Sequence, residues 1–521
     1  MDLDPPPSNE RESQPLAGLA TLKVPARGER RMASSEGRTA NDESFPSART
    51  TDDQRRTTLS YETAVAQMYA LGHELAQTPS HKFDLAHIRV LLAALGHPEN
   101  SFPTVLVAGT NGKGSTAATL ASILQASGLK TGLYTSPHLI RINERIRLDG
   151  EPIGSEDFAL LHDVVDRTAE RLVGEGDLPW HPSFFEMLTA MAFEYFARSR
   201  PDMVVLEVGM GGRLDATNVV EPRLSIITDI ALDHQKYLGE TIGEIAREKA
   251  GIIRPGGVVV TLPQLPEAND VIGNTILDVG ARAVNAVPYV PPVSPGSGQW
   301  PVASGQWQRY PLDVMGARIL VESPLVGRHQ LRNLALAIAA AVELRDQGIA
   351  QITPETIAQG IRETHWPGRF QVVRAAGDNP EYVLDVAHNP AGAWALRATL
   401  SAAYQNPRNG EPGNGDPGNG REITIVFGVM RDKAVAEIAE ILFPIASHVI
   451  LTHANNPRSA SPDEIHRAAW RVAAGVDIEE AEDVALALDR ARKLAGSGGL
   501  VVVTGSIYVV GEAMRTLGVN I

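Results

Sequence analysis

The residues with the clearest chemistry lie in the segment VLVAGTNGKGST, residues 105–116, where glycines, a lysine and two hydroxyls stand between a buried strand and a helix. Free backbone N–H groups at the start of a helix attract phosphate, and Lys113 adds a mobile positive charge. Gly112 and Gly114 let the backbone approach phosphate oxygens. Ser115 or Thr116 can ligate magnesium. The segment therefore predicts a loop that binds the phosphates of a nucleotide.

The spacing of this loop departs from the common GxxxxGK[ST] pattern. Val107 stands where that pattern has its first glycine, and Gly114 separates Lys113 from the hydroxyls. A glycine turn that only caps a helix is the alternative. The flanking strand and helix favour phosphate binding.

Short β-branched runs alternate with helical patterns on either side of this loop, which predicts an α/β fold with a mostly parallel sheet. A second such series begins after a Pro-rich stretch around residues 263–300, which we expect to be irregular. The expected strands of the two series are TVLVA (104–108), MVVLEV (203–208), LSIIT (224–228) and GVVVT (257–261), then YVLDV, ITIVFG, HVILT and LVVVTG.

Three parts are predicted along the chain. Residues 1–57 are polar and lack apolar periodicity, which predicts a disordered leader. Residues 58–355 form the P-loop domain, and residues 356–521 form a smaller Rossmann-like α/β domain, with the boundary near the turn WPGR. The Gly- and Pro-rich stretch 406–420 predicts a surface insertion.

Composition excludes several classes of protein. The formal net charge of −15 argues against a general nucleic-acid or membrane-surface binder. The absence of cysteine among the 521 residues excludes disulfides, thiolate metal sites and a cysteine nucleophile. No apolar run reaches the roughly 20 residues needed to span a bilayer, and no signal-peptide core is present. A cytoplasmic enzyme, expected to be a monomer, is the simplest interpretation.

GTNGKGS resembles the P-loop of folylpolyglutamate synthases, and a related GTNGK followed by Thr or Ser belongs to the Mur ligases. Further segments that look like folylpolyglutamate synthase signatures recur in family order from about residue 60 to the C-terminus. The chain is therefore identified as a member of the folylpolyglutamate synthase and dihydrofolate synthase family. These segments are TSPHLIRINERIRLDG (135–150), SFFE (183–186), EVGMGGRLDATN (207–218), LDHQKYLGETIGEIAREKAGI (232–252), GRHQLRNLALA (327–337), PGRFQ (367–371) and LDVAHNP (384–390).

Glu207 follows the apolar run MVVLE, so its carboxylate is expected at the carboxyl edge of the sheet, where it suits Mg²⁺. The resemblance implies that Ser136, Glu207 and His234 hold one magnesium and that Ser115 helps to hold a second, with a monovalent cation as a further candidate. A structural, hydrogen-bonded His234 is the alternative. Without the resemblance, Lys249 would be predicted to lie at the surface. The resemblance implies instead that CO₂ carbamylates it.

GMGG lacks the third glycine of GxGxxG, which excludes a dinucleotide fingerprint. The resemblance instead implies that this loop and SFFE bind a pterin. Helix packing for the phenylalanines and turn chemistry for the aspartate are the alternatives. The candidate pterin residues are Ser183, Phe184, Phe185, Glu186, Leu214, Asp215 and Ala216.

The resemblance also implies the ATP contacts and the catalytic residues. Arg369 follows a tight turn and can stabilise transferring phosphoryl oxygens, while His388 approaches the reacting phosphate or the amino acid. Buried-polar packing for Asn333 and a helix start for His388 are the alternatives. Ser506 and Tyr508 are candidates for the glutamate pocket. The ATP set is Thr110, Asn111, Gly112, Lys113, Gly114, Ser115, Thr116, Asn333, Arg369 and Asp385, and the catalytic set is Lys113, Lys249, Arg369 and His388.

The resemblance implies an ATP-dependent ligase that joins L-glutamate to dihydropteroate and to tetrahydrofolate through an acyl phosphate. The GGRLDATN segment favours both activities. A monofunctional folylpolyglutamate synthase is the nearest alternative, followed by a Mur-type cell-wall ligase. A P-loop regulatory ATPase would not account for the Ser136, Glu207, His234 and Lys249 set.

Overall fold

The computed structural model describes residues 59–72, 84–292, 307–374, 379–405, 421–473 and 475–519. Residues from Thr58 onward form one compact unit. The predicted leader, residues 1–57, and the predicted insertion, residues 406–420, lie outside the described residues. Within the described part, no helix is both long and apolar enough to cross a membrane.

An eight-stranded sheet forms the centre of the first module, with the order β4-β3-β2-β5-β1-β6-β7-β8. Strands β2, β5, β1, β6, β7 and β8 pair in parallel, and β3 and β4 add an antiparallel edge. The predicted mostly parallel sheet is confirmed. The strands are β1 (Thr104–Ala108), β2 (Thr131–Tyr134), β3 (Ile146–Leu148), β4 (Glu151–Pro152), β5 (Met203–Glu207), β6 (Leu224–Ile227), β7 (Val258–Thr261) and β8 (Arg282–Asn285).

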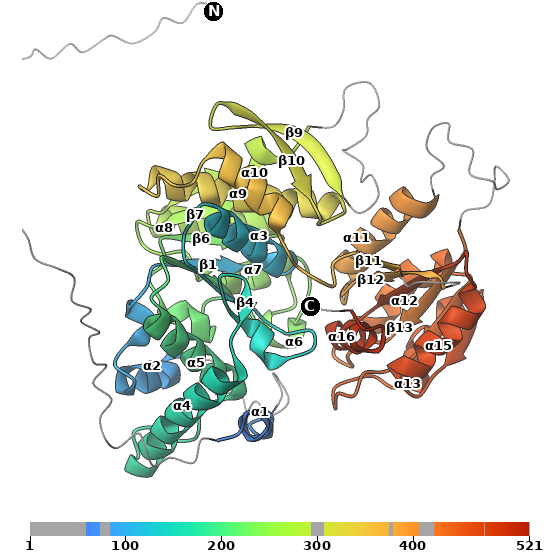
Figure 1. The fold of residues 1–521 in the computed structure, drawn as a ribbon, viewed down its shortest axis with the longest axis horizontal. Coiled ribbons are helices and arrows are strands. Elements are labelled where there is room, and N and C mark those ends of the chain that lie inside the picture. The colour runs from blue at the N-terminus through green and yellow to red at the C-terminus, as the bar shows by residue number, and fades with distance from the viewer. Residues whose placement is uncertain are drawn as a thin grey trace, which may run out of the picture. The chain divides into compact units, whose positions relative to one another are not determined.

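The central strands β2, β5, β1 and β6 are buried on both faces of the sheet, which accounts for their mostly apolar sequences. In β1, Leu106 and Ala108 belong to one core, and Val105 and Val107 belong to the other. Figure 1 shows helices on both sides of the sheet. The first face packs on α1 (Tyr61–Ala70), α2 (Leu85–Ala94), α4 (Ser155–Glu175), α5 (Phe184–Ser199), α7 (Ile242–Ala250) and α8 (Pro266–Asp278), and the second on α3 (Lys113–Ala126), α9 (Arg328–Asp346) and α10 (Pro354–Glu363).

A six-stranded sheet forms the second module, in the order β11-β12-β16-β13-β14-β15, parallel except for β11. The predicted smaller α/β domain is confirmed as a fold. Its strands are β11 (Gln371–Arg374), β12 (Glu381–Leu384), β13 (Ile423–Phe427), β14 (His448–Leu451), β15 (Asp477–Glu480) and β16 (Leu500–Thr504). Its helices are α11 (Pro390–Leu400), α12 (Val435–Leu442), α13 (Pro462–Ala468), α14 (Trp470–Ala473), α15 (Val484–Ala495) and α16 (Ile507–Thr516).

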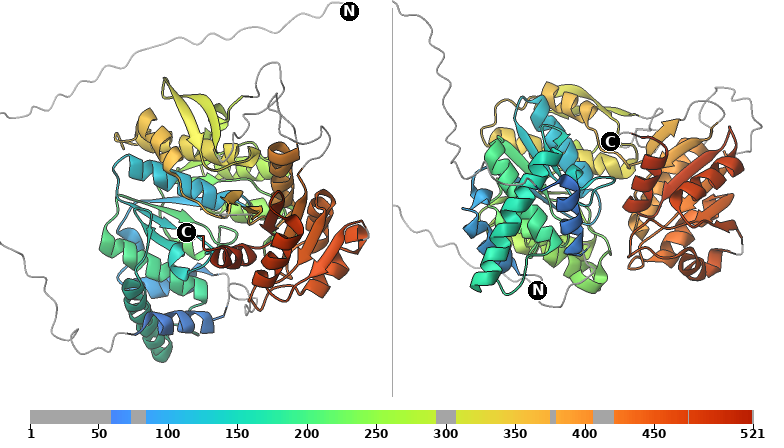
Figure 2. Two further views of the ribbon diagram at one scale, coloured as in Figure 1. Left: turned by 45° about the vertical axis from the view of Figure 1, so that its right-hand side comes forward. Right: turned by 60° about the horizontal axis from the view of Figure 1, so that its bottom comes forward.

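The prediction of an irregular stretch at residues 263–300 was wrong for residues 266–285, and residues 293–300 lie outside the described residues. Pro266 occupies the first turn of α8, where a missing N–H costs nothing, and β8 adds the last strand of the large sheet. A hairpin of β9 (Gln308–Val314) and β10 (Ala317–Ser323) follows, with alternating burial. Figure 2 shows this hairpin in yellow.

Helix α10 packs against α3 and β10 of the first module. The predicted division after residue 355 falls inside this helix. We propose that the first module extends to about residue 364, because the first strand of the second sheet begins at Gln371.

Candidate active site

The phosphate loop joins the end of β1 to the first turn of α3, and its glycines are required by close packing. Gly112 has φ 87°, and a β-carbon there would lie 2.1 Å from Asn333 Oδ1. A β-carbon on Gly109 would lie 1.8 Å from Thr228 Oγ1. Lys113 begins α3, and its Nζ donates to Thr110 O at 3.2 Å. The glycines therefore let the loop pack against distant residues, and the loop itself supplies the positive charge of Lys113.

Helix α9 covers this loop. Asn333 is buried and donates to Gln330 Oε1 at 2.8 Å, and its carbonyl accepts from Thr116 Oγ1 at 3.4 Å. One turn of the same helix carries Arg332, whose guanidinium pairs with Asp229 at 2.6 Å. The Asp229 carbonyl in turn accepts from the N–H groups of residues 110 and 111. The sequence analysis identified Asn333 but missed the Arg332–Asp229 pair.

Glu207 ends β5 beside the phosphate loop, as predicted from its position at the sheet edge. Its Oε2 accepts from Ser136 N at 3.2 Å. Burial raises the pKa of the Glu207 carboxyl, and the charges of Lys113 and Arg369 oppose this shift. A buried carboxylate with free lone pairs is suited to a cation.

His234 lies in the loop after β6 with φ 51°, at the start of the short helix α6 (Gln235–Leu238). Its buried Nδ1 has no hydrogen-bond partner, and burial lowers the pKa of the imidazole to about 3. A neutral imidazole with an unpartnered nitrogen is a competent metal ligand. The described residues hold no group of three His, Asp or Glu side chains placed for a metal. A divalent cation here would need oxygens from serine and phosphate as well.

Lys249 is buried at the end of α7, not on the surface. Its Nζ donates to Gly109 O at 2.7 Å, at the start of the phosphate loop. Burial and the nearby charge of Lys113 lower the pKa of this amine to about 7. A large fraction of Lys249 is therefore an uncharged amine near neutral pH, which is the form that reacts with CO₂.

The second module contributes Arg369 and Asp385. Asp385 Oδ2 accepts from Phe370 N at 2.8 Å, and its Oδ1 accepts from Ala387 N at 2.9 Å, so this carboxylate shapes the turn that carries Arg369. The guanidinium of Arg369 lies 5.9 Å from the ring of Trp366. Burial lowers the pKa of Arg369, and the charges of Asp385 and Glu207 oppose that shift.

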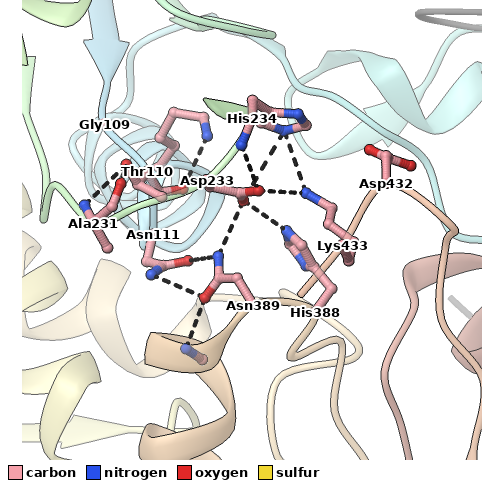
Figure 3. Close-up of polar contacts among 12 residues, drawn as sticks. Gly109, Thr110, Asn111, Ala231, Asp233, His234, His388, Asn389, Asp432 and Lys433 are labelled. Carbon is pink, nitrogen blue, oxygen red and sulfur yellow. Dashed lines mark hydrogen bonds and ion pairs between the residues drawn. The ribbon is translucent and has the colours of Figure 1, made fainter. Parts of the chain in front are cut away.

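His388 and Asn389 reach the phosphate loop and the His234 loop (Figure 3). Asn389 Nδ2 donates to Asn111 Oδ1 at 2.9 Å and to Asp233 Oδ2 at 3.1 Å. His388 Nε2 lies 3.6 Å from the same Asp233 oxygen. Asn389 also caps α11, so the predicted helix start and the site contact coexist.

The predicted pterin residues fall into two groups. Phe185 packs on the GMGG loop, where a β-carbon on Gly209 would lie 2.6 Å from its ring. Phe184 instead lies in the core, stacked on Tyr69 with ring centroids 5.9 Å apart. Glu186 caps α5 by accepting from Ser183 N at 2.9 Å and also pairs with His87 at 3.1 Å. Both rings line the cavity, but Phe185 is half-buried whereas Phe184 is buried.

Asp215 holds the GMGG loop in shape. Its carboxylate accepts from Met210 N at 3.0 Å, Thr217 N at 3.0 Å and Thr217 Oγ1 at 2.6 Å. Asp215 therefore stabilises a turn, which was the alternative to pterin binding for this residue. Gly212 packs against the end of α7, since its β-carbon would lie 3.0 Å from Lys249 O. The glycines of this loop therefore allow close packing.

One cavity of about 770 Å³ brings the predicted residues together. Thr116 lies outside its lining, in the buried first turn of α3. Lining residues that the sequence analysis missed include Asp229, Asp233, Arg332, Lys433 and Arg458. Lys433 and Arg458 each follow a strand of the second parallel sheet, and this position is the signal that could have found them. The predicted residues in the lining are Thr110, Asn111, Gly112, Lys113, Gly114, Ser115, Ser136, Ser183, Phe184, Phe185, Glu186, Glu207, Leu214, Asp215, Ala216, His234, Lys249, Asn333, Arg369, Asp385, His388, Ser506 and Tyr508.

Comparison with known proteins gives the same assignment for both modules. Residues 186–341 match the Mur ligase middle domain, and residues 368–507 match the glutamate ligase domain of Mur ligases. The folylpolyglutamate synthase of Lacticaseibacillus casei is 34% identical, over 88% of this chain and 99% of that protein. The dihydrofolate synthase/folylpolyglutamate synthase of Bacillus subtilis is 34% identical, over 83% and 94%.

Solved structures agree with these relatives. The Mycobacterium tuberculosis folylpolyglutamate synthase, solved with ADP and AMPPCP, superposes with a TM-score of 0.72 at 31% identity, covering 87% of this chain and 99% of that one. The fold and the site thus define an ATP-dependent ligase of the Mur ligase superfamily. Within it, the chain belongs to the folylpolyglutamate synthase and dihydrofolate synthase family.

Proposed function

We propose that this ligase joins L-glutamate to dihydropteroate and adds further glutamates to tetrahydrofolate. The observation that carries the proposal is one cavity whose lining includes the phosphate loop, Phe185 and residues 506–508. Such a cavity can hold a nucleotide, a flat aromatic acceptor and an amino acid at once. The name of the B. subtilis relative, which combines both activities, supports the bifunctional assignment.

Apolar side chains contribute to the acceptor end of the cavity. Leu85 and Ile88 of α2 lie in its lining with Phe185 and Leu238. A pterin ring can stack on the Phe185 face and leave its carboxylate pointing toward the phosphate loop. We propose that Glu186, Asp215 and their neighbours mainly hold the shape of this end, because their carboxylates are satisfied by backbone and side-chain donors.

The chemistry must activate a carboxylate that is a poor electrophile. In the proposed reaction, a carboxylate oxygen of the acceptor attacks the γ-phosphorus of ATP, ADP leaves, and an acyl phosphate forms. Lys113 and Arg369 stabilise the charge that spreads over the transferring oxygens. The neutral amine of glutamate then attacks the acyl carbon, phosphate leaves with the acceptor oxygen, and the amine loses a proton.

Magnesium is part of this proposal. Glu207, His234 and Ser136 would hold one ion and Ser115 would help to hold another, because the buried Glu207 carboxylate and the unpartnered His234 Nδ1 fit a cation. Bound magnesium would neutralise charge on the phosphate oxygens. We propose that carbamylated Lys249 supplies a negative charge beside this site, since its amine is buried next to the phosphate loop.

We place glutamate on the second-module side of the cavity. Ser506 caps α16, and Tyr508 and Arg458 lie in the same lining. Arg458 is also paired with Asp432 at 2.8 Å. His388 lines the same cavity. A cytoplasmic monomer remains the expected form of the enzyme.

The test is ATP-dependent phosphate release with L-glutamate plus either dihydropteroate or tetrahydrofolate, with the amide product identified by mass. We expect release with both acceptors and its loss in Lys113→Ala. Release with tetrahydrofolate alone would reduce the activity to polyglutamylation. Release with neither would overturn the proposal and favour a Mur-type acceptor.

A further inference from the structure

One carboxylate, that of Asp233, collects donors from both modules. Its Oδ1 accepts from His234 N at 2.9 Å and from Lys433 Nζ at 2.6 Å. Its Oδ2 accepts from Asn389 Nδ2 at 3.1 Å and lies 3.6 Å from His388 Nε2. Figure 3 shows these side chains pointing toward Asp233. Asp233 and Lys433 are 200 residues apart in sequence and belong to different modules.

The pair is largely shielded from solvent. The side chains of Asp233 and Lys433 are only 8% and 7% exposed, although both line the cavity. A charge that has lost most of its contact with water is costly unless an opposite charge accompanies it. The contact therefore favours one arrangement of the two modules, because Asp233 and Lys433 keep each other as ion-pair partners only in that arrangement.

The loops on either side of this pair carry the chemistry. Asp233 directly precedes His234, and Lys433 Nζ lies 3.5 Å from His234 Nε2. Asn389 donates hydrogen bonds to both Asp233 and Asn111, so the same contact region includes the phosphate loop. Separation of Lys433 from Asp233 would leave the hydrogen bonds of Asn389 to hold the second module against both loops.

We propose that Lys433 is a positioning residue whose ion pair with Asp233 locks the second module onto the phosphate and His234 loops. The proposal rests on the proposed function. Locking matters after phosphoryl transfer, because the acyl phosphate has two fates. Attack by the glutamate amine gives amide and phosphate, whereas attack by water gives the original carboxylate and phosphate. A second module that is not held in place favours attack by water over attack by the glutamate amine.

The predicted signature is uncoupling, measured as phosphate released per amide formed with L-glutamate and an acceptor at saturation. Wild type should release one phosphate per amide. Lys433→Met should release at least two and form amide at least tenfold more slowly, while affinity for AMPPCP changes less than twofold. Arg431→Met is the matched control, because Arg431 lies in the same loop but pairs with Glu464 at the surface. It should behave as wild type.

Three results would overturn the proposal. One phosphate per amide and an unchanged rate of amide formation in Lys433→Met would show that the ion pair does not position the second module. A ratio of one with a raised KM for glutamate alone would show that Lys433 binds glutamate directly. Additive losses in Asp233→Asn, Lys433→Met and the double variant would show that the residues act separately, whereas the proposal predicts that the double variant is no worse than Asp233→Asn, which already breaks the ion pair.

Lys433→Arg is a second test in case Lys433→Met fails to fold. It keeps the charge and should restore most of the coupling; failure to do so in a variant that still binds AMPPCP would contradict the ion-pair account. The wild-type reaction distinguishes failure of the proposed function from failure of the Lys433 proposal. If wild type forms no amide with glutamate, the proposed function fails, whatever Lys433 does.

Discussion

Asn333 of α9 covers Gly112 of the phosphate loop so closely that a β-carbon on Gly112 would lie 2.1 Å from Asn333 Oδ1. Gly112 also has φ 87°, a conformation that side chains disfavour. The loop is therefore shaped by a helix more than 200 residues away in sequence as well as by its own glycines.

Gly112→Ala should weaken nucleotide binding, because both the clash and the left-handed backbone force the loop to move. We expect the affinity for AMPPCP, measured by calorimetry, to fall by at least about tenfold. Gly174→Ala is the matched control: Gly174 lies in α4 with no atom near its β-carbon. It should leave binding unchanged and raise the unfolding free energy by about 0.4–1 kcal/mol. Equal affinities in both variants would contradict this view of the loop.

Arg369→Lys tests the geometry of the guanidinium. Lysine keeps the charge but loses the planar fork that can contact two oxygens. We expect kcat for amide formation to fall by about 10²-fold, with a smaller change in AMPPCP affinity. Rates should be measured by rapid quench with both acceptors. A kcat within twofold of wild type would show that Arg369 does not act on the transferring group.

Phe184 and Phe185 are neighbours with different expected roles. Phe185→Ala should raise KM for dihydropteroate by about tenfold through lost stacking, and should leave KM for ATP unchanged. Phe184→Leu should lower the melting temperature instead, because Phe184 packs in the core against Tyr69 and Arg145. If Phe184→Leu rather than Phe185→Ala raised KM for dihydropteroate, the assignment of the acceptor end would be wrong.

Lys249 gives a prediction about pH. Burial depresses the pKa of its amine to about 7, so the neutral amine predominates above that pH and declines as the pH falls through it. At a fixed partial pressure of CO₂, the carbamate should therefore disappear as the pH is lowered below about 7. Carbon-13 NMR with labelled bicarbonate should show the carbamate in wild type and not in Lys249→Met. Identical spectra for the two proteins would rule out the modification.

The sequence predicted the phosphate loop because its signal is local: glycines and Lys113 stand between an apolar run and a helical pattern. Glu207 was predictable for the same reason, since a parallel strand leads directly to it. Helix α8 was missed because the prolines of residues 263–300 suggested an irregular stretch, although proline is accepted in a first helical turn.

Asp233 and Lys433 could not be paired from sequence, because no local pattern records a contact across 200 residues. Family resemblance supplied His234 and Lys249, but only the structure shows the unpartnered His234 Nδ1 and the burial of Lys249. The distinction between Phe184 and Phe185 likewise depends on which face of α5 meets the core.

The central claim is that an acyl phosphate links ATP to amide formation, and oxygen transfer tests it most directly. The acceptor carboxylate is labelled with ¹⁸O, and the phosphate released in a single turnover with L-glutamate is analysed by mass spectrometry. The account predicts one acceptor oxygen in each phosphate, because the oxygen that attacks phosphorus leaves with it. Phosphate without the label, formed together with amide, would contradict the account.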